Sequence, residues 1–150
     1  MRYELMSPSE LRTAMQERWP LVLPLGVLEY HGEHLPLGMD TLAVTETLAL
    51  LEKEMDIVIL PAFYYGACSF AVEDAENRGS VHVDSNALLV MARQIFAGLL
   101  QVGFRNIHAF VHHQSENFAS GMPTDLAFRL VAKQVIFEFL DQSRGKGWWG

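Results

Sequence analysis

The chain has 150 residues, half of them hydrophobic, and a formal net charge of −7. This length and composition fit one globular domain with a hydrophobic core and exclude a disordered chain. Basic residues are scattered, which excludes the basic stripe of a nucleic-acid-binding surface. We see no signal peptide and no apolar run near the roughly 18 residues of a membrane span. With its single cysteine, Cys68, the chain is expected to be cytoplasmic, without nucleic-acid or membrane partners.

The first predicted elements lead from the N-terminus to a polar segment at residues 29–40. Ser7, Pro8 and Glu10 predict a capping box at the start of a helix that ends near Glu17. Residues 21–25 are a short apolar run, which is typical of a strand buried on both faces. Apolar residues at near-helical spacing over 41–54 predict a helix that packs on the sheet.

The second half repeats the alternation of strands and helices. Residues 57–60 predict a β-branched strand stopped by a proline. A loop over 62–84 is long for a compact domain, which indicates a functional loop or an unrecognised short element. Beyond it we expect a helix over 85–101, capped by Asp84 or Ser85, a strand over 107–111 and a helix over 123–143.

Successive strand–loop–helix units predict a parallel sheet with helices on both faces. In such sheets the functional crevice lies beyond the carboxyl ends of the strands, where the strand order reverses. Polar clusters follow the first strand at residues 29–40 and the third strand at residues 112–117. Both clusters meet if the first and third strands are neighbours and the second strand lies outside the first.

The cluster after the first strand contains three candidate metal ligands. In an extended segment Glu29 and His31 point to the same side, and a loop with two glycines and a proline can fold Asp40 back toward them. Carboxylates with imidazole are typical of Zn or Mn sites rather than of structural zinc, which favours thiolates.

Each of these residues also has a purely structural interpretation. Asp40 could be the N-cap of a helix that begins at Thr41. His31 and His34 could be loop histidines with satisfied hydrogen bonds, and Glu29 could pair with an arginine. The concentration of ionisable groups directly after a buried strand, with a second group after another strand, favours the metal site.

Residues 24–40 carry a resemblance to a known family. Their sequence resembles the signature P-x-G-x-x-E-x-H-G-x-H-L-P-L-x-x-D of the creatininase (creatinine amidohydrolase) family, with complete agreement in spacing. Residues 61–66 resemble its P-x-x-x-Y-G segment, residues 77–80 its F-P-G-T turn, and residues 103–107 the approach to its third strand. The resemblance implies a three-layer α/β/α fold with a mostly parallel sheet. It also implies that residues 1–150 are one creatininase-like domain that lacks the family's C-terminal portion.

The resemblance implies a ligand for each of two metal ions. Glu29 would bind one ion, His31 the other, and Asp40 would bridge them. His34 would act in catalysis from the second layer by orienting a ligand carboxylate.

The family's third-strand motif aligns with residues 112–117. Glu116 then takes the place of the glutamate that joins His31 as a ligand and acts in catalysis. Gln114 stands where the family has a histidine ligand, and a neutral amide oxygen binds Zn more weakly than imidazole does. His113 lies one residue away and could substitute for that histidine.

The implied function is hydrolysis of an amide-like C–N bond in a small cyclic amide or formamide by metal-activated water. The implied cofactors are one or two divalent ions, Zn, Mn or Fe, and the implied assembly is a homo-oligomer, a hexamer in the family. Gln114 and the shorter chain leave an alternative open, a non-catalytic relative that keeps the fold and a partial metal site.

Overall fold

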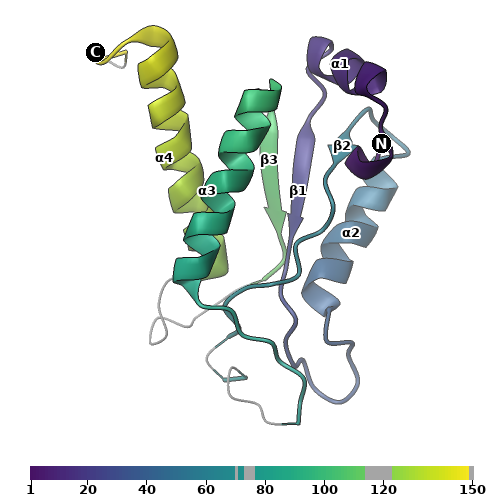
Figure 1. Cartoon of the computed structure of the whole chain (residues 1–150). Helices are drawn as coiled ribbons and strands as arrows, with labels where there is room; N and C mark the ends of the chain where they lie inside the picture. Colours follow the sequence, from purple (N-terminus) through teal and green to yellow (C-terminus); the bar gives the residue numbers. More distant parts are fainter. Residues whose placement is uncertain (70, 73–76, 114–122, 149–150) are drawn as a thin grey trace.

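A parallel sheet lies at the centre of the computed structural model, which describes all residues except 70, 73–76, 114–122 and 149–150 (Figure 1). Within those residues the sheet has three strands in the order β2-β1-β3. The elements in chain order are η1 (Tyr3–Leu5), α1 (Pro8–Gln16), β1 (Leu21–Leu25), α2 (Met39–Leu51), β2 (Val58–Ile59), α3 (Ser85–Val102), β3 (Ile107–Val111) and α4 (Thr124–Arg144).

The central strand is β1, which pairs in parallel with both neighbours. Leu21 is in register with Val58 of β2 and Ile107 of β3, and every residue of β1 is buried. This order meets the condition for the two polar clusters to converge, because the first and third strands are neighbours and the second strand lies outside the first. The segments that follow β1 and β3 therefore leave the sheet at the same end, side by side.

Alternate residues of β1 contact helices on opposite faces of the sheet. Leu23 and Leu25 pack in one cluster with Phe96 of α3 and Phe128 of α4. Val22 packs in another cluster, and its helical partners Val44 and Leu48 come from α2. The result is the predicted three-layer α/β/α arrangement, with α3 and α4 on one face and α2 on the other (Figure 1).

The helix α3 covers the centre of its face of the sheet. By length and composition alone it is apolar enough to cross a membrane, a test that core helices of soluble proteins also pass. Ala92 and Phe96 pack in the core cluster with β1 and α4, and Leu99 packs in a second cluster with Leu21 of β1 and Ala14 of α1. We therefore interpret α3 as a core helix.

The capping box at the start of α1 is confirmed. The Ser7 side chain accepts a hydrogen bond from the Glu10 backbone N–H, and the Glu10 carboxylate accepts one from the Ser7 backbone N–H. The predicted helices at 85–101 and 123–143 and the strand at 107–111 agree with the structure to within one residue at each end.

Two predicted boundaries are wrong near the polar cluster. The helix predicted over 41–54 is α2, which begins at Met39 with Gly38 as its N-cap and ends at Leu51. Asp40 is therefore inside the first turn of α2, and its interpretation as an N-cap is wrong. The strand predicted over 57–60 is reduced to Val58–Ile59, the two residues that are in continuous register with β1.

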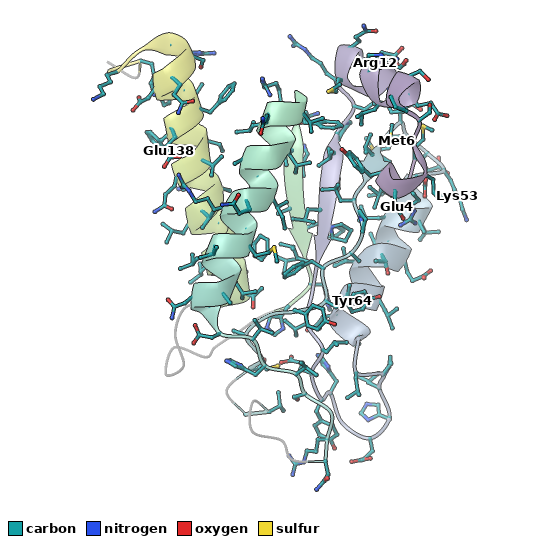
Figure 2. The ribbon with its side chains drawn as sticks, in the orientation of Figure 1. Glu4, Met6, Arg12, Lys53, Tyr64 and Glu138 are labelled. Atoms are coloured by element: carbon teal, nitrogen blue, oxygen red, sulfur yellow. The ribbon has the colours of Figure 1, made fainter. Side chains whose placement is uncertain are left out.

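Gly26 allows α2 to begin directly against the end of β1. A Cβ at Gly26 would lie 2.5 Å from the backbone nitrogen of Thr41 and 2.7 Å from its Cα. No side chain fits in that space, so the close approach brings Asp40 next to the segment that leaves β1. Figure 2 shows Tyr64 at the same end of the molecule, near the beginning of α2, whereas Arg12 on α1 lies at the opposite end.

Candidate metal centre

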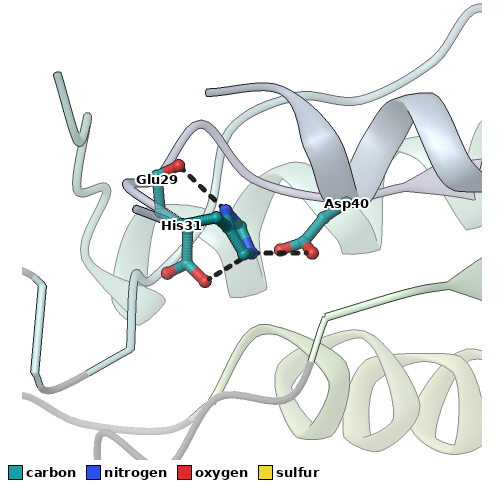
Figure 3. Close-up of side chains that lie close together, drawn as sticks. All are labelled: Glu29, His31 and Asp40. Carbon is teal, nitrogen blue, oxygen red and sulfur yellow. Dashed lines mark hydrogen bonds and ion pairs between the residues drawn. The ribbon is translucent and has the colours of Figure 1, made fainter. Parts of the chain in front are cut away.

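Three potential ligands from two elements converge beyond the carboxyl end of β1. Glu29 and His31 lie on the segment after β1, and Asp40 lies in the first turn of α2. One donor atom from each of the three residues can be chosen so that all lie within 4.8 Å of one another. Figure 3 shows the His31 ring between the two carboxylates. The predicted convergence of Glu29, His31 and Asp40 is thus present in the structure.

The orientation of His31 leaves one ring nitrogen for a metal. Nδ1 lies 3.0 Å from the backbone oxygen of Glu29, and because a carbonyl oxygen only accepts, Nδ1 carries the hydrogen. Nε2 faces the two carboxylates, 3.2 Å from Asp40 Oδ1 and 3.5 Å from Glu29 Oε1. Second-layer hydrogen bonds of this kind set the tautomer of histidines that bind metals.

Glu29 is buried and held by the loop that follows β2. Its Oε2 accepts the Ser69 backbone N–H at 2.8 Å, and its Oε1 lies 3.3 Å from the Ser69 hydroxyl. Burial alone would raise the pKa of Glu29, but the His113 ring and the Ser69 N–H outweigh it and lower that pKa below its usual value. Glu29 is therefore an ionised carboxylate at neutral pH.

His113 enters the same cluster from the end of β3. Its Nδ1 lies 2.8 Å from Asp40 Oδ2 and 3.5 Å from Glu29 Oε1, and its Nε2 lies 3.0 Å from the Ala67 backbone oxygen. Both ring nitrogens face acceptors, so both must donate and the ring is an imidazolium. Burial opposes this charge, but Asp40, Glu29 and the Ala67 carbonyl raise the pKa of His113 to about 9.

The other nearby histidines are more exposed. His112 Nδ1 lies 3.6 Å from Asp40 Oδ1, with its side chain 56% exposed. His34 is exposed, and within the described part of the chain it makes no hydrogen bond to Glu29, His31 or Asp40. Its predicted second-layer role stays a prediction.

The donor set fits a divalent metal ion. Glu29 and Asp40 are each about 4% exposed, and every ion pair they form with described residues involves a histidine. Nε2 of His31 faces the same two buried carboxylates, whose negative charges a cation bound between them would offset. Two carboxylates and one imidazole, without thiolate, match catalytic Zn or Mn sites. Glu116 and Gln114, the other predicted ligands, lie outside the described residues.

Comparison with known proteins identifies the family. The family model Creatininase, described as creatinine amidohydrolase, matches residues 4–141. The chain belongs to the creatininase family. A creatinine amidohydrolase from Pseudomonas putida is 26% identical to it over 121 residues, which cover 79% of this chain and 46% of the relative.

Solved creatininase structures share the fold. A tryptophan-to-phenylalanine mutant creatininase superposes with a TM-score of 0.79 at 17% identity, covering 96% of this chain and 54% of that one. A creatininase described as its Mn form gives 0.74 at 19% identity, covering 92% and 53%. A mutant described as the Zn-Zn type gives 0.74 at 17% identity, covering 99% and 65%. This creatininase-family chain thus spans about half the length of most of these relatives and 65% of the Zn-Zn type mutant.

Sequence reasoning missed the contacts that hold the ligands. Ser69 and Ala67 reach Glu29 and His113 mainly through backbone groups, whose direction no residue type reveals. It weighed His113 only as a substitute for Gln114, whereas His113 lies directly against Asp40. The signal that could have identified His113 was its place two residues beyond β3, at the same sheet edge as Glu29.

Proposed function

We propose that this chain binds a divalent metal ion through Glu29, His31 and Asp40 and hydrolyses an amide-like C–N bond of a small cyclic amide or formamide. The observation that carries the proposal is the His31 ring, whose Nδ1 is occupied by a backbone carbonyl while Nε2 faces two buried carboxylates. Such a bound ion would act as a Lewis acid and lower the pKa of a bound water. Zn or Mn fits the donors best, and Fe stays a further option.

The chain's own residues would divide the remaining tasks. Ser69 holds the Glu29 carboxylate, and the Glu29 carbonyl fixes the His31 tautomer. The His113 imidazolium offsets negative charge on Asp40. Buried carboxylates and a buried imidazolium keep the charges fixed, so that they need no reorganisation during a reaction. Glu116 and His34 remain the residues that we propose for catalysis beside these ligands.

A second candidate function is a non-catalytic relative with a partial metal site. It is favoured by Gln114, which stands where the family has a histidine ligand. The chain also spans only about half the length of the relatives reported above. On this reading the chain would be a binding or assembly subunit with at most one ion.

Metal analysis of protein purified without chelator tests the metal site. We expect about one equivalent of Zn, Mn or Fe per chain in the wild type and a large loss in Asp40→Ala. If the wild type holds only a trace of metal and Asp40→Ala holds the same amount, the proposed metal site is wrong.

Assays on small cyclic amides and formamides, with the product identified, separate the two candidate functions. Hydrolysis that is lost in Glu116→Ala would rule out the non-catalytic reading. Metal binding without turnover of any of these substrates would favour it. Cytoplasmic location, a homo-oligomeric state and a single domain over residues 1–150 stay predictions beside this proposal.

A further inference from the structure

Thr124, the first residue of α4, is fully buried and lies outside the ligand set. Its hydroxyl oxygen lies 2.8 Å from the Ala67 backbone nitrogen, whose N–H it accepts. The same oxygen lies 3.3 Å from the Ala67 carbonyl oxygen, to which the hydroxyl donates. One side chain therefore satisfies both backbone groups of a residue 57 positions away in the sequence.

Residues 66–69, which we call the strap, connect this hydroxyl to the candidate metal centre. The Ala67 carbonyl accepts the His113 Nε2–H at 3.0 Å, and the Ser69 N–H donates to Glu29 at 2.8 Å. Between them, the Cys68 N–H donates to His82 Nδ1 at 3.2 Å. One short stretch of backbone thus hydrogen-bonds both the Glu29 carboxylate and the His113 ring.

The strap lies too close to its neighbours to shift freely. A Cβ at Gly66 would lie 2.6 Å from Thr124 Oγ1 and 2.6 Å from Val27 Cγ1. The Gly66 carbonyl also accepts the Val83 backbone N–H at 2.9 Å. Gly66 is therefore clamped between α4 and the segment after β1, and the Thr124 hydroxyl fixes the next residue.

We propose that Thr124 is a positioning residue for the metal centre, acting through the strap. Its hydroxyl fixes the Ala67 carbonyl that orients the His113 ring and, two residues on, the Ser69 N–H that orients Glu29. Outer-layer groups of this kind tune metal affinity without touching the ion. The metal part of this inference rests on the proposed function, whereas the orientation of His113 does not.

The chain offers a matched control in Thr41. Thr41 is also fully buried in the first turn of a helix, but its hydroxyl has no hydrogen-bond partner among the described residues. A Thr→Val change keeps the side-chain shape and removes only the hydroxyl at either position. Thr124→Val therefore loses a hydrogen-bonded contact with the strap, whereas Thr41→Val loses none.

The test measures Mn²⁺ affinity of the full chain by calorimetry in wild type, Thr124→Val, Thr124→Ser and Thr41→Val. We expect Thr124→Val to weaken Mn²⁺ binding about 10- to 100-fold, the effect typical of outer-layer partners. Thr124→Ser keeps the hydroxyl and should restore affinity close to wild type, and Thr41→Val should leave it unchanged. A folded Thr124→Val with wild-type affinity, or a Thr124→Ser variant as impaired as Thr124→Val, would overturn the proposal.

NMR of the His113 ring in metal-free protein supplies the second readout. In wild type the Nε2–H should give a hydrogen-bonded proton resonance, which Thr124→Val should weaken or shift while Thr41→Val does not. If wild-type protein binds no Mn²⁺, the proposed function fails. The positioning role of Thr124 is judged separately, and an unchanged His113 resonance in Thr124→Val would overturn it. If Thr124→Val does not fold, Thr124→Cys, a weaker hydrogen-bonding group, takes its place in both measurements.

Discussion

At the scale of single residues, two histidines contact the same pair of carboxylates, Glu29 and Asp40. His31 contacts a backbone carbonyl with one nitrogen and directs the other at Glu29 and Asp40. His113 does the same from the end of β3, with the Ala67 carbonyl on one nitrogen and Asp40 and Glu29 on the other. The two rings differ in burial, because the His113 side chain is 1% exposed and the His31 side chain 21%.

Asp40 should be the most sensitive position for metal binding, because its two oxygens contact His31 and His113 separately. Asp40→Asn keeps the shape but removes the negative charge. We expect it to lower Zn²⁺ or Mn²⁺ affinity by more than the roughly 10- to 100-fold typical of outer-layer changes. Titration against a chromophoric chelator measures this, with the exposed Asp56→Asn as control. Equal affinity in Asp40→Asn and Asp56→Asn would show that Asp40 is not a ligand.

The raised pKa of His113 predicts that the stability of the metal-free protein depends on pH. Its pKa rises from 6.5 to about 9 on folding, so the folded state binds the proton more tightly than the unfolded state. The stabilisation from His113 is complete below about pH 6.5. It is lost as pH rises through about 9. Urea unfolding in EDTA between pH 6 and 10 should show this loss, and His113→Gln should flatten it. If the unfolding free energy of His113→Gln falls with pH as steeply as that of wild type, the pH dependence belongs to other groups.

At the scale of elements, the site depends on how α2 meets β1. Asp40 reaches the cluster because α2 begins at Met39, and α2 begins there because Gly26 leaves room for the Thr41 backbone. The sequence predicted the elements around this junction well, since their apolar patterns are strong. It placed the start of α2 two residues late, because a capping aspartate and an aspartate in the first turn have the same local pattern.

Gly26→Ala should destabilise the fold. Its Cβ would lie within 2.7 Å of Thr41 backbone atoms, which cannot move without shifting α2. We expect a loss of about 1–3 kcal/mol in the free energy of unfolding, as for other overpacked sites. Gly98→Ala in α3 is the control, because nothing lies within 4 Å of its new Cβ. It should gain about 0.5–1 kcal/mol from helix propensity, and thermal or urea unfolding checks both values.

At the scale of the whole molecule, the sheet is covered unevenly. Every residue of β1 is buried, whereas His108, Ala109 and Phe110 of β3 are exposed. Parallel sheets are normally covered on both faces, and an edge strand with free backbone groups invites pairing with another chain. The predicted homo-oligomer would bury this surface.

We therefore expect β3 to take part in self-association. Sedimentation velocity over a range of concentrations should show species larger than a monomer, and Phe110→Lys should reduce them, because a lysine on an edge strand opposes pairing. Leu50→Lys, at a 63% exposed position on α2, is the control and should leave the distribution unchanged. A monomer at all concentrations, or equal effects of the two substitutions, would contradict a role for β3.

The sequence by itself determined the α/β class and the position of three candidate ligands after β1, because these follow from local apolar periodicity and a short motif. The strand order β2-β1-β3 came from the tertiary structure. Only the tertiary structure decided that Asp40 lies inside a helical turn and that His113 bridges Asp40 and Ala67. It also decided that Thr124 holds the strap. Those contacts join residues up to 73 positions apart through backbone atoms and ring tautomers. Their geometry depends on the packing of whole elements, which no local pattern of residue types encodes.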